Sequence, residues 1–188
     1  IVSGVTATAV ETGAASTLAT IAQINSLQAQ ATSAGGGASF VYTKVNDTSA
    51  NILANTSGGS IQDITGKTVT VTTASNASNY AAMLTAAGGG GSVAGAVVDS
   101  ASNLETVTLT GATSVTAEIS NANDLTAVTL DSEVTHIDIS TNSVANVLLD
   151  INDLTNRTVV NASSAGSYKV KDTASVLAGA SSSLLNGQ

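Results

Sequence analysis

Six aspartates at or near predicted turns are the residues of this 188-residue chain whose type and spacing could support chemistry. They are Asp99, Asp124, Asp131, Asp150, Asp153 and Asp172. Carboxylate oxygens are hard ligands, and several that converge from successive turns can bind calcium. Asp is also a common turn residue without any ligand. The sequence therefore leaves two interpretations, a calcium site that stabilises stacking or assembly, and ordinary turns.

His136, the only histidine, lies on a predicted strand with Asp138, and Glu118 and Arg157 are expected one repeat before and after it. One interpretation is a proton-transfer cluster, and the other is a row of surface charges. The second is favoured, because one histidine without cysteine or a nucleophile motif is poor material for catalysis. Zinc, which needs three or four nitrogen or sulfur ligands, is excluded. We predict that the chain is not an enzyme.

Three further functions are disfavoured by what the chain lacks. Enzymes that cleave acidic polysaccharides need basic residues beside their carboxylates, and Arg157 is the sole arginine. An ice-binding array of Thr-x-Thr rows starts at Thr68–Thr72 and Thr106–Thr110 but does not persist in later repeats. The glycine runs are not followed by the Lys-Ser/Thr pair of a phosphate-binding loop.

The charge balance excludes other partners. Thirteen acids stand against five bases, which gives a net charge of −8. Nucleic-acid binding needs several Lys or Arg on one face, so it is excluded. No apolar run approaches the roughly 20 residues that span a bilayer, so we predict no membrane insertion. Absence of cysteine, together with abundant Thr, Ser, Asn and Gly, favours an extracellular, bacterial location.

The elements that would position these residues follow a repeat of about 21 residues. Four blocks align, and Val107, Val128, Leu149 and Val170 fall in step. Each block holds two short stretches that alternate apolar and polar residues, as half-buried strands do. A fixed repeat of this length predicts units that bury their apolar rows by stacking. The predicted fold is mainly β, a parallel β-solenoid with about 21-residue coils and two strands per coil.

The N-terminal half predicts helices as well. Ala14–Ala34 has helical spacing and ends at three glycines, and a shorter helix is expected over Asn76–Ala87. We predict one continuous solenoid domain over 1–188, with a helix-containing part at 1–66 and regular coils at 67–188. Both ends are interpreted as processing points or cuts, so the chain is expected to be a piece of a longer one.

Two short segments carry a family resemblance. Val45–Leu53 (VNDTSANIL) and Lys169–Leu177 (KVKDTASVL), set among VTVT-type strands, resemble repeats of large secreted bacterial surface proteins. That class includes S-layer proteins and giant adhesins of the RTX type. The calcium nonapeptide G-G-x-G-x-D of the RTX class is missing from this sequence. The resemblance implies an exported structural or adhesive repeat.

The function expected from the sequence is structural. It is a component of a bacterial extracellular assembly, such as an S-layer, surface filament or adhesin stalk, that associates with copies of itself through solenoid ends or edges. The alternative is a cell-surface binding module that recognises a glycan or a host protein. Calcium is the only cofactor under consideration.

Overall fold

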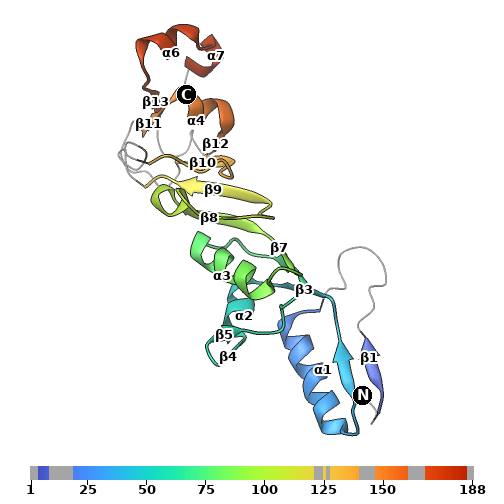
Figure 1. The fold of residues 1–188 in the computed structure, drawn as a ribbon. Helices are drawn as coiled ribbons and strands as arrows, with labels where there is room; N and C mark the ends of the chain where they lie inside the picture. The colour runs from blue at the N-terminus through green and yellow to red at the C-terminus, as the bar shows by residue number, and fades with distance from the viewer. Residues whose placement is uncertain are drawn as a thin grey trace. The chain divides into compact units, whose positions relative to one another are not determined.

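The computed structural model describes residues 4–8, 19–120, 125, 128–139, 147–160 and 168–185. The chain divides into two compact units. The first contains Ile1–Gly95 with Thr110–Ala112, and the second contains Ala96–Leu109 with Thr113–Gln188. In both units short strands alternate with short helices (Figure 1). Every strand pair among the described residues is parallel except the hairpin of β4 and β5.

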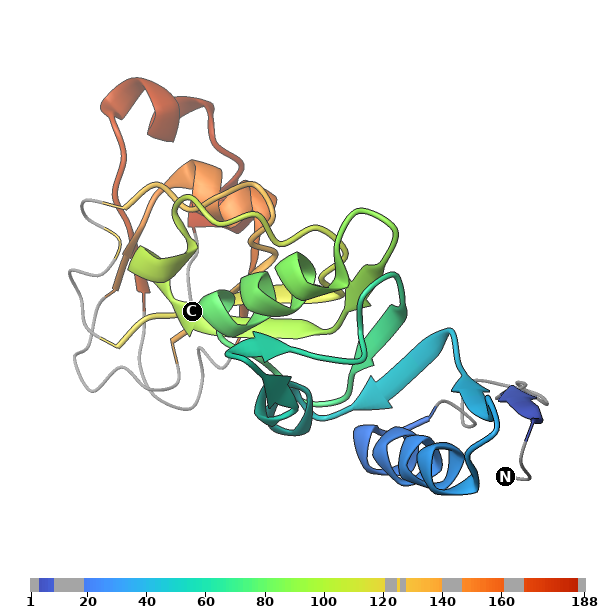
Figure 2. The same cartoon turned by 60° about the horizontal axis from the view of Figure 1, so that its bottom comes forward.

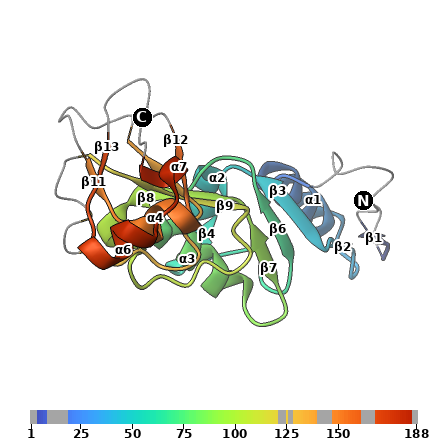
Figure 3. The same cartoon turned by 90° about the horizontal axis from the view of Figure 1, so that it is seen from above.

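The first unit holds ten of the described elements. They are β1 (Thr6–Thr8), α1 (Ile21–Ala34), β2 (Ser39–Val41), β3 (Lys44–Asp47), α2 (Ser49–Ala54), β4 (Thr56–Ser57), β5 (Ser60–Ile61), β6 (Thr68–Val71), α3 (Ala77–Ala87) and β7 (Ser92–Ala94). Strands β3, β6 and β7 form one sheet in that order, and they run side by side in Figure 3. Their register aligns Val45, Val69 and Val93, all of which are buried. The alternating pattern of β6 thus buries one face of the strand, as the sequence predicts.

The two predicted helices form, and their ends follow from local chemistry. Thr20 and Gln23 make a reciprocal capping box at the start of α1, and Gly35 ends the helix with φ of 64°. Asn76 caps α3 in the same unit. In Figure 2, α1 (blue) lies along β2. No helix among the described residues has both the length and the apolar character needed to cross a membrane.

The second unit holds the remaining described elements. They are β8 (Ala96–Ser100), the 3-10 helix η1 (Ala101–Leu104), β9 (Ser114–Glu118), β10 (His136–Asp138), β11 (Val147–Leu149), α4 (Ile151–Asn156), β12 (Thr158–Val160), β13 (Tyr168–Val170), α6 (Ala174–Gly179) and α7 (Ser182–Leu185). Four strands form one parallel sheet in the order β12, β10, β9, β8, and β11 pairs with β13. The fully buried side chains include Ile137, Ile139 and Leu149.

The prediction of a mainly β, parallel solenoid is wrong. The structure mixes helices and strands, its sheets hold two to four strands, and the described residues form no closed solenoid. The physical reason lies in the polar residues after the strands. Thr48, Asp150 and Thr173 were expected in turns, but each caps a short helix through its side chain. These helices replace the turns and second strands that a two-strand coil requires.

The expected strand stacking holds only in part. Leu149 pairs with Val170 in parallel register, as the repeat predicts. Val107 and Val128 lie outside every strand, so the row does not continue. Near Val107, the backbone N–H of Leu109 donates to the carboxylate of Glu133 at 2.6 Å instead of joining a ladder. An alternating pattern marks a half-buried extended segment but does not choose its hydrogen-bond partner.

A second predicted row slips by one residue. Ala117 pairs with Ile137, as expected, but Ile137 then pairs with Val159, not with Thr158. Because side chains alternate between the faces of a strand, this shift changes which residue of β12 lies on the face of Ile137. The spacing between these strands is therefore not a constant 21 residues.

Candidate functional site

Aspartates that follow a strand share one local arrangement. In Asp47, Asp99 and Asp172, Oδ1 accepts the backbone N–H of the next residue at 2.8, 2.8 and 2.7 Å. The side-chain amides of Asn51 and Asn103 donate to the first two of these oxygens at 2.7 and 2.8 Å. Such local bonds fix the chain direction at the start of a helix. These carboxylates therefore order the turn that follows each strand.

In three places, a side-chain oxygen near the end of a strand also accepts the backbone N–H of the first residue of an earlier helix. The pairs are Asp47 Oδ2 with Ile21 N at 2.9 Å, Thr73 Oγ1 with Ser49 N at 3.1 Å, and Asp172 Oδ2 with Ile151 N at 3.2 Å. The first N–H groups of a helix have no partner within it. We call Asp47, Thr73 and Asp172 the helix-start acceptors. They join segments that lie 21 to 26 residues apart in the chain.

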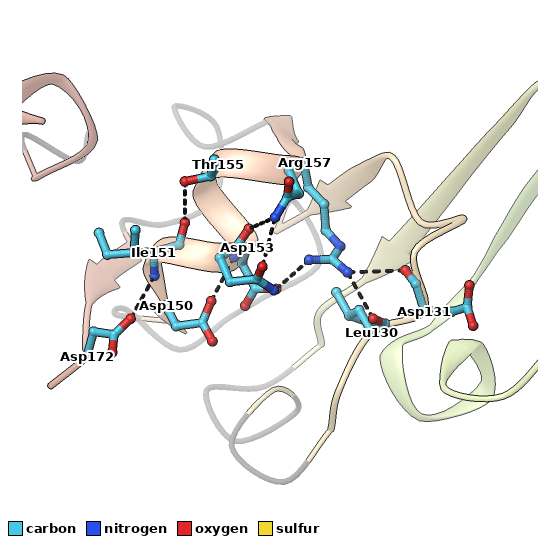
Figure 4. Close-up of polar contacts among 10 residues, drawn as sticks. Leu130, Asp131, Asp150, Ile151, Asp153, Thr155, Arg157 and Asp172 are labelled. Atoms are coloured by element: carbon cyan, nitrogen blue, oxygen red, sulfur yellow. Dashed lines mark hydrogen bonds and ion pairs between the residues drawn. The ribbon is translucent and has the colours of Figure 1, made fainter. Parts of the chain in front are cut away.

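A buried arginine ties α4 to the segment before β10 in the second unit (Figure 4). The Arg157 side chain is 5% exposed, and its Nη1 lies 3.0 Å from Asp153 Oδ1. Its Nη2 donates to the carbonyl oxygens of Leu130 and Asp131 at 2.9 and 3.1 Å. Asp150 caps the same helix by accepting the N–H of Asp153 at 2.7 Å. The arginine thus bonds to backbone and carboxylate together.

Asp153 carries the perturbed acid of this cluster. Burial raises its pKa above the ordinary value for aspartate, and the nearby charge of Asp150 raises it further. The Arg157 guanidinium and the hydrogen bond at Asp150 lower the pKa without cancelling these effects. Arg157 Nε is buried and has no hydrogen-bond partner within the described part of the chain. Asp153 consequently holds a proton more readily than a free aspartate does.

A cavity of about 500 Å³ lies beside this cluster. Its polar lining comes from Asp150, Asn152, Asp153, Lys171, Asp172 and Thr173, and its apolar lining from Leu125, Val128, Leu130, Leu148 and Leu149, with Thr129. The lining combines acceptors for hydroxyl or ammonium donors with an apolar wall. This arrangement can hold a polar ligand that also presents carbon surface.

The structure gathers half of the aspartates proposed as calcium ligands. Asp150, Asp153 and Asp172 line the same cavity, whereas Asp131 lines another one with Glu105. Asp99 caps the turn after β8, and Asp124 falls outside the described residues. Within the described ranges, no three His, Cys, Asp or Glu side chains are grouped so that they could hold a metal. Calcium binding therefore stays a prediction, and backbone N–H groups are the ligands these carboxylates show.

The expected charge row around His136 is present only in part. Asp138 pairs with Glu118 across the β9–β10 ladder, and His136 Nδ1 lies 2.8 Å from the hydroxyl of Thr135. Arg157 immediately precedes the residue that pairs with His136, but its side chain contacts Asp153 instead. The arginine was expected in an exposed row and is buried.

A second polar cluster, in the first unit, was missed by the sequence reasoning. Asp63 has a positive φ of 61° and accepts hydrogen bonds from the side-chain amides of Gln28 and Asn55 at 3.1 and 3.0 Å. The Tyr42 hydroxyl donates to the Asp63 carbonyl at 2.8 Å, and burial foremost raises the pKa of this tyrosine. Lys67 Nζ lies 4.8 Å from the centre of the Tyr42 ring. The cluster ties α1 and the end of α2 to the loop before β6.

Comparisons with known proteins give no relative for this chain. No family model, no curated protein and no solved structure matches it. Functional inference therefore starts from the residues and contacts described above.

Proposed function

We propose that this chain is a structural segment of a bacterial extracellular assembly, such as an S-layer, surface filament or adhesin stalk, and that it associates with copies of itself. The observation that carries the proposal is the set of helix-start acceptors. Their side-chain oxygens bind the helix starts of earlier segments, so these polar groups serve architecture. A surface with 13 acids, five bases and no tryptophan also suits a scaffold more than a catalyst.

Strand edges supply the means of association. The sheets are small and mostly parallel, and each two- to four-stranded sheet ends in edge strands. An edge strand presents N–H and C=O groups on which another chain can pair. Calcium, if it binds near Asp150, Asp153 and Asp172, would strengthen assembly by neutralising acidic charge.

A second candidate function is recognition of a cell-surface glycan or host protein. The cavity beside Asp150 and Asp153 favours it, because carboxylates accept hydrogen bonds from sugar hydroxyls while the leucine wall contacts ring carbons. Under this alternative the chain acts as a monomer and the cavity is its binding site.

Sedimentation velocity over a wide concentration range, with excess calcium and then with a chelator, separates the two functions. Growth of the sedimentation coefficient with concentration, and filaments or sheets by negative-stain microscopy, support the scaffold. A strictly monomeric chain that binds members of a glycan array overturns it. Equal assembly in calcium and chelator removes the calcium component alone.

A further inference from the structure

Two segments of this chain share the same local sequence and the same capping bonds. Asp47 and Thr48 begin α2, and Asp172 and Thr173 begin α6. In each, the aspartate accepts the N–H of the threonine, and the threonine hydroxyl accepts the N–H three residues on. We call Lys44–Ala54 the covered segment and Tyr168–Gly179 the uncovered segment, for the reason given next.

The two segments differ in what lies over them. In the covered segment Ile52 is 0% exposed, whereas Leu177, at the same position of the uncovered segment, is only half-buried. Helix α6 buries none of its residues. The N–H of Ser49 is bound by Thr73, but the equivalent N–H, that of Ala174, has no acceptor outside its own helix within the described ranges. Equal sequences therefore end in unequal burial, because only one has a following segment packed on it.

The uncovered segment presents the surface on which such a segment would sit. Strand β13 pairs in parallel with β11, and within the described residues no other strand pairs with it. A groove of about 470 Å³ runs beside it, lined by Tyr168, Lys169, Val170, Leu177 and Leu185. Val176 and Leu185 are 42% and 41% exposed, among the most exposed large apolar side chains described. Strand edge, groove and apolar side chains lie within one short stretch of chain.

Charge identifies the occupant. Lys169 and Lys171, two of the five basic residues, lie on or next to β13, and the chain as a whole carries a net charge of −8. A second copy is thus attracted to this edge. It also carries strands that end in a helix-start acceptor, the chemistry that the Ala174 N–H lacks. Two-fold pairing of β13 with itself is disfavoured, because antiparallel pairing of Tyr168–Val170 places Lys169 opposite its own copy.

We propose that the uncovered segment is a docking surface for a second copy of this chain. A strand of the second copy pairs with the free edge of β13, its acceptor side chain binds the N–H of Ala174, and its apolar residues cover Val176, Leu177 and Leu185. Since β13 meets a different surface of the partner, the contact is heterologous and continues into a filament. This inference rests on the proposed self-association and names the surface that performs it.

The test uses the full chain and three variants. Val176→Glu adds a charge to the docking surface, and Val41→Glu adds the same charge at a valine that is 43% exposed in the first unit. We expect Val176→Glu to weaken association roughly tenfold or more, as loss of a central apolar contact does, and Val41→Glu to leave it unchanged. Lys169→Glu with Lys171→Glu, both at exposed positions, should weaken association and reverse its salt dependence.

A residue-level readout is hydrogen exchange at the Ala174 amide. We expect slower exchange in the assembled chain than in the dilute monomer, while the amide of Ile21, already bound by Asp47, changes little. If the chain assembles but neither Val176→Glu nor the lysine variant weakens it, the docking surface is wrong and the scaffold proposal stands. Stronger association of the lysine variant also refutes the docking surface, because the lysines then protect the edge. A chain that never assembles overturns the proposed function itself.

Discussion

Replacement of Asp47 is the sharpest test of the helix-start acceptors. Its side chain is 7% exposed and accepts three hydrogen bonds, from Ile21 N at 2.9 Å, Thr48 N at 2.8 Å and Asn51 Nδ2 at 2.7 Å. Asp47→Ala removes all three bonds. The buried N–H of Ile21 then loses its acceptor, while Thr48 and Asn51 can turn to water.

The expected loss of stability follows from these environments. An unsatisfied buried donor costs about 1 to 3 kcal/mol, and the bonds to a charged acceptor add to that, so we expect Asp47→Ala to lower the free energy of unfolding by about 3 kcal/mol. Thr73→Val is the matched control in the same unit. It removes a single neutral bond from an exposed side chain at nearly constant shape, so the expected loss is about 1 kcal/mol.

Urea unfolding followed by circular dichroism measures both losses, and hydrogen exchange locates them. The Ile21 amide should exchange much faster in Asp47→Ala, and the Ser49 amide should do so in Thr73→Val. A loss for Asp47→Ala no larger than that for Thr73→Val would refute the reasoning, since the buried carboxylate would then contribute no more than an exposed hydroxyl.

Two further predictions concern ionisation and backbone geometry. Because the folded-state pKa of Asp153 is raised, its ionisation costs stability as pH rises through that pKa; Asp150→Asn should lower the pKa and shrink this loss, as carboxyl NMR titration and urea midpoints at acidic and neutral pH will show. An unchanged Asp153 pKa would contradict the assigned role of Asp150. Gly111→Ala should destabilise by about 2 kcal/mol or more, because φ is +87° and a Cβ there meets the Val93 carbonyl. Gly58→Ala, with φ of +60° and open space around it, should cost about 1 kcal/mol in the same thermal melts.

Helix starts and stops were predictable because they depend on a few neighbouring residues. Asn76 caps α3 and Gly88 ends it, and the predicted range differs from the observed helix by only the cap residue. The short helices α2, α4 and α6 carry equally local signals in Thr48, Asp150 and Thr173. They were interpreted as turns because the repeat suggested a solenoid.

Strand partners were less predictable because pairing joins residues some 20 or more positions apart. The register of Leu149 with Val170 follows the repeat, but that of Ile137 with Val159 departs from it by one residue. The candidate site shows the same limit. Aspartates were expected near turns, yet their contact with earlier helix starts, and the buried position of Arg157, depend on segments distant in sequence.

The sequence by itself determined the local elements, the acidic and base-poor surface, and the capping chemistry at Asp47 and Asp172. Tertiary structure alone decided burial, as Ile52 and Leu177 demonstrate: they occupy equivalent positions of nearly the same motif but have different exposure. Capping acts over three or four residues and is written into the motif. Burial depends on what packs over the motif, which here comes from residues much further along the chain or, as we propose at β13, from a second copy.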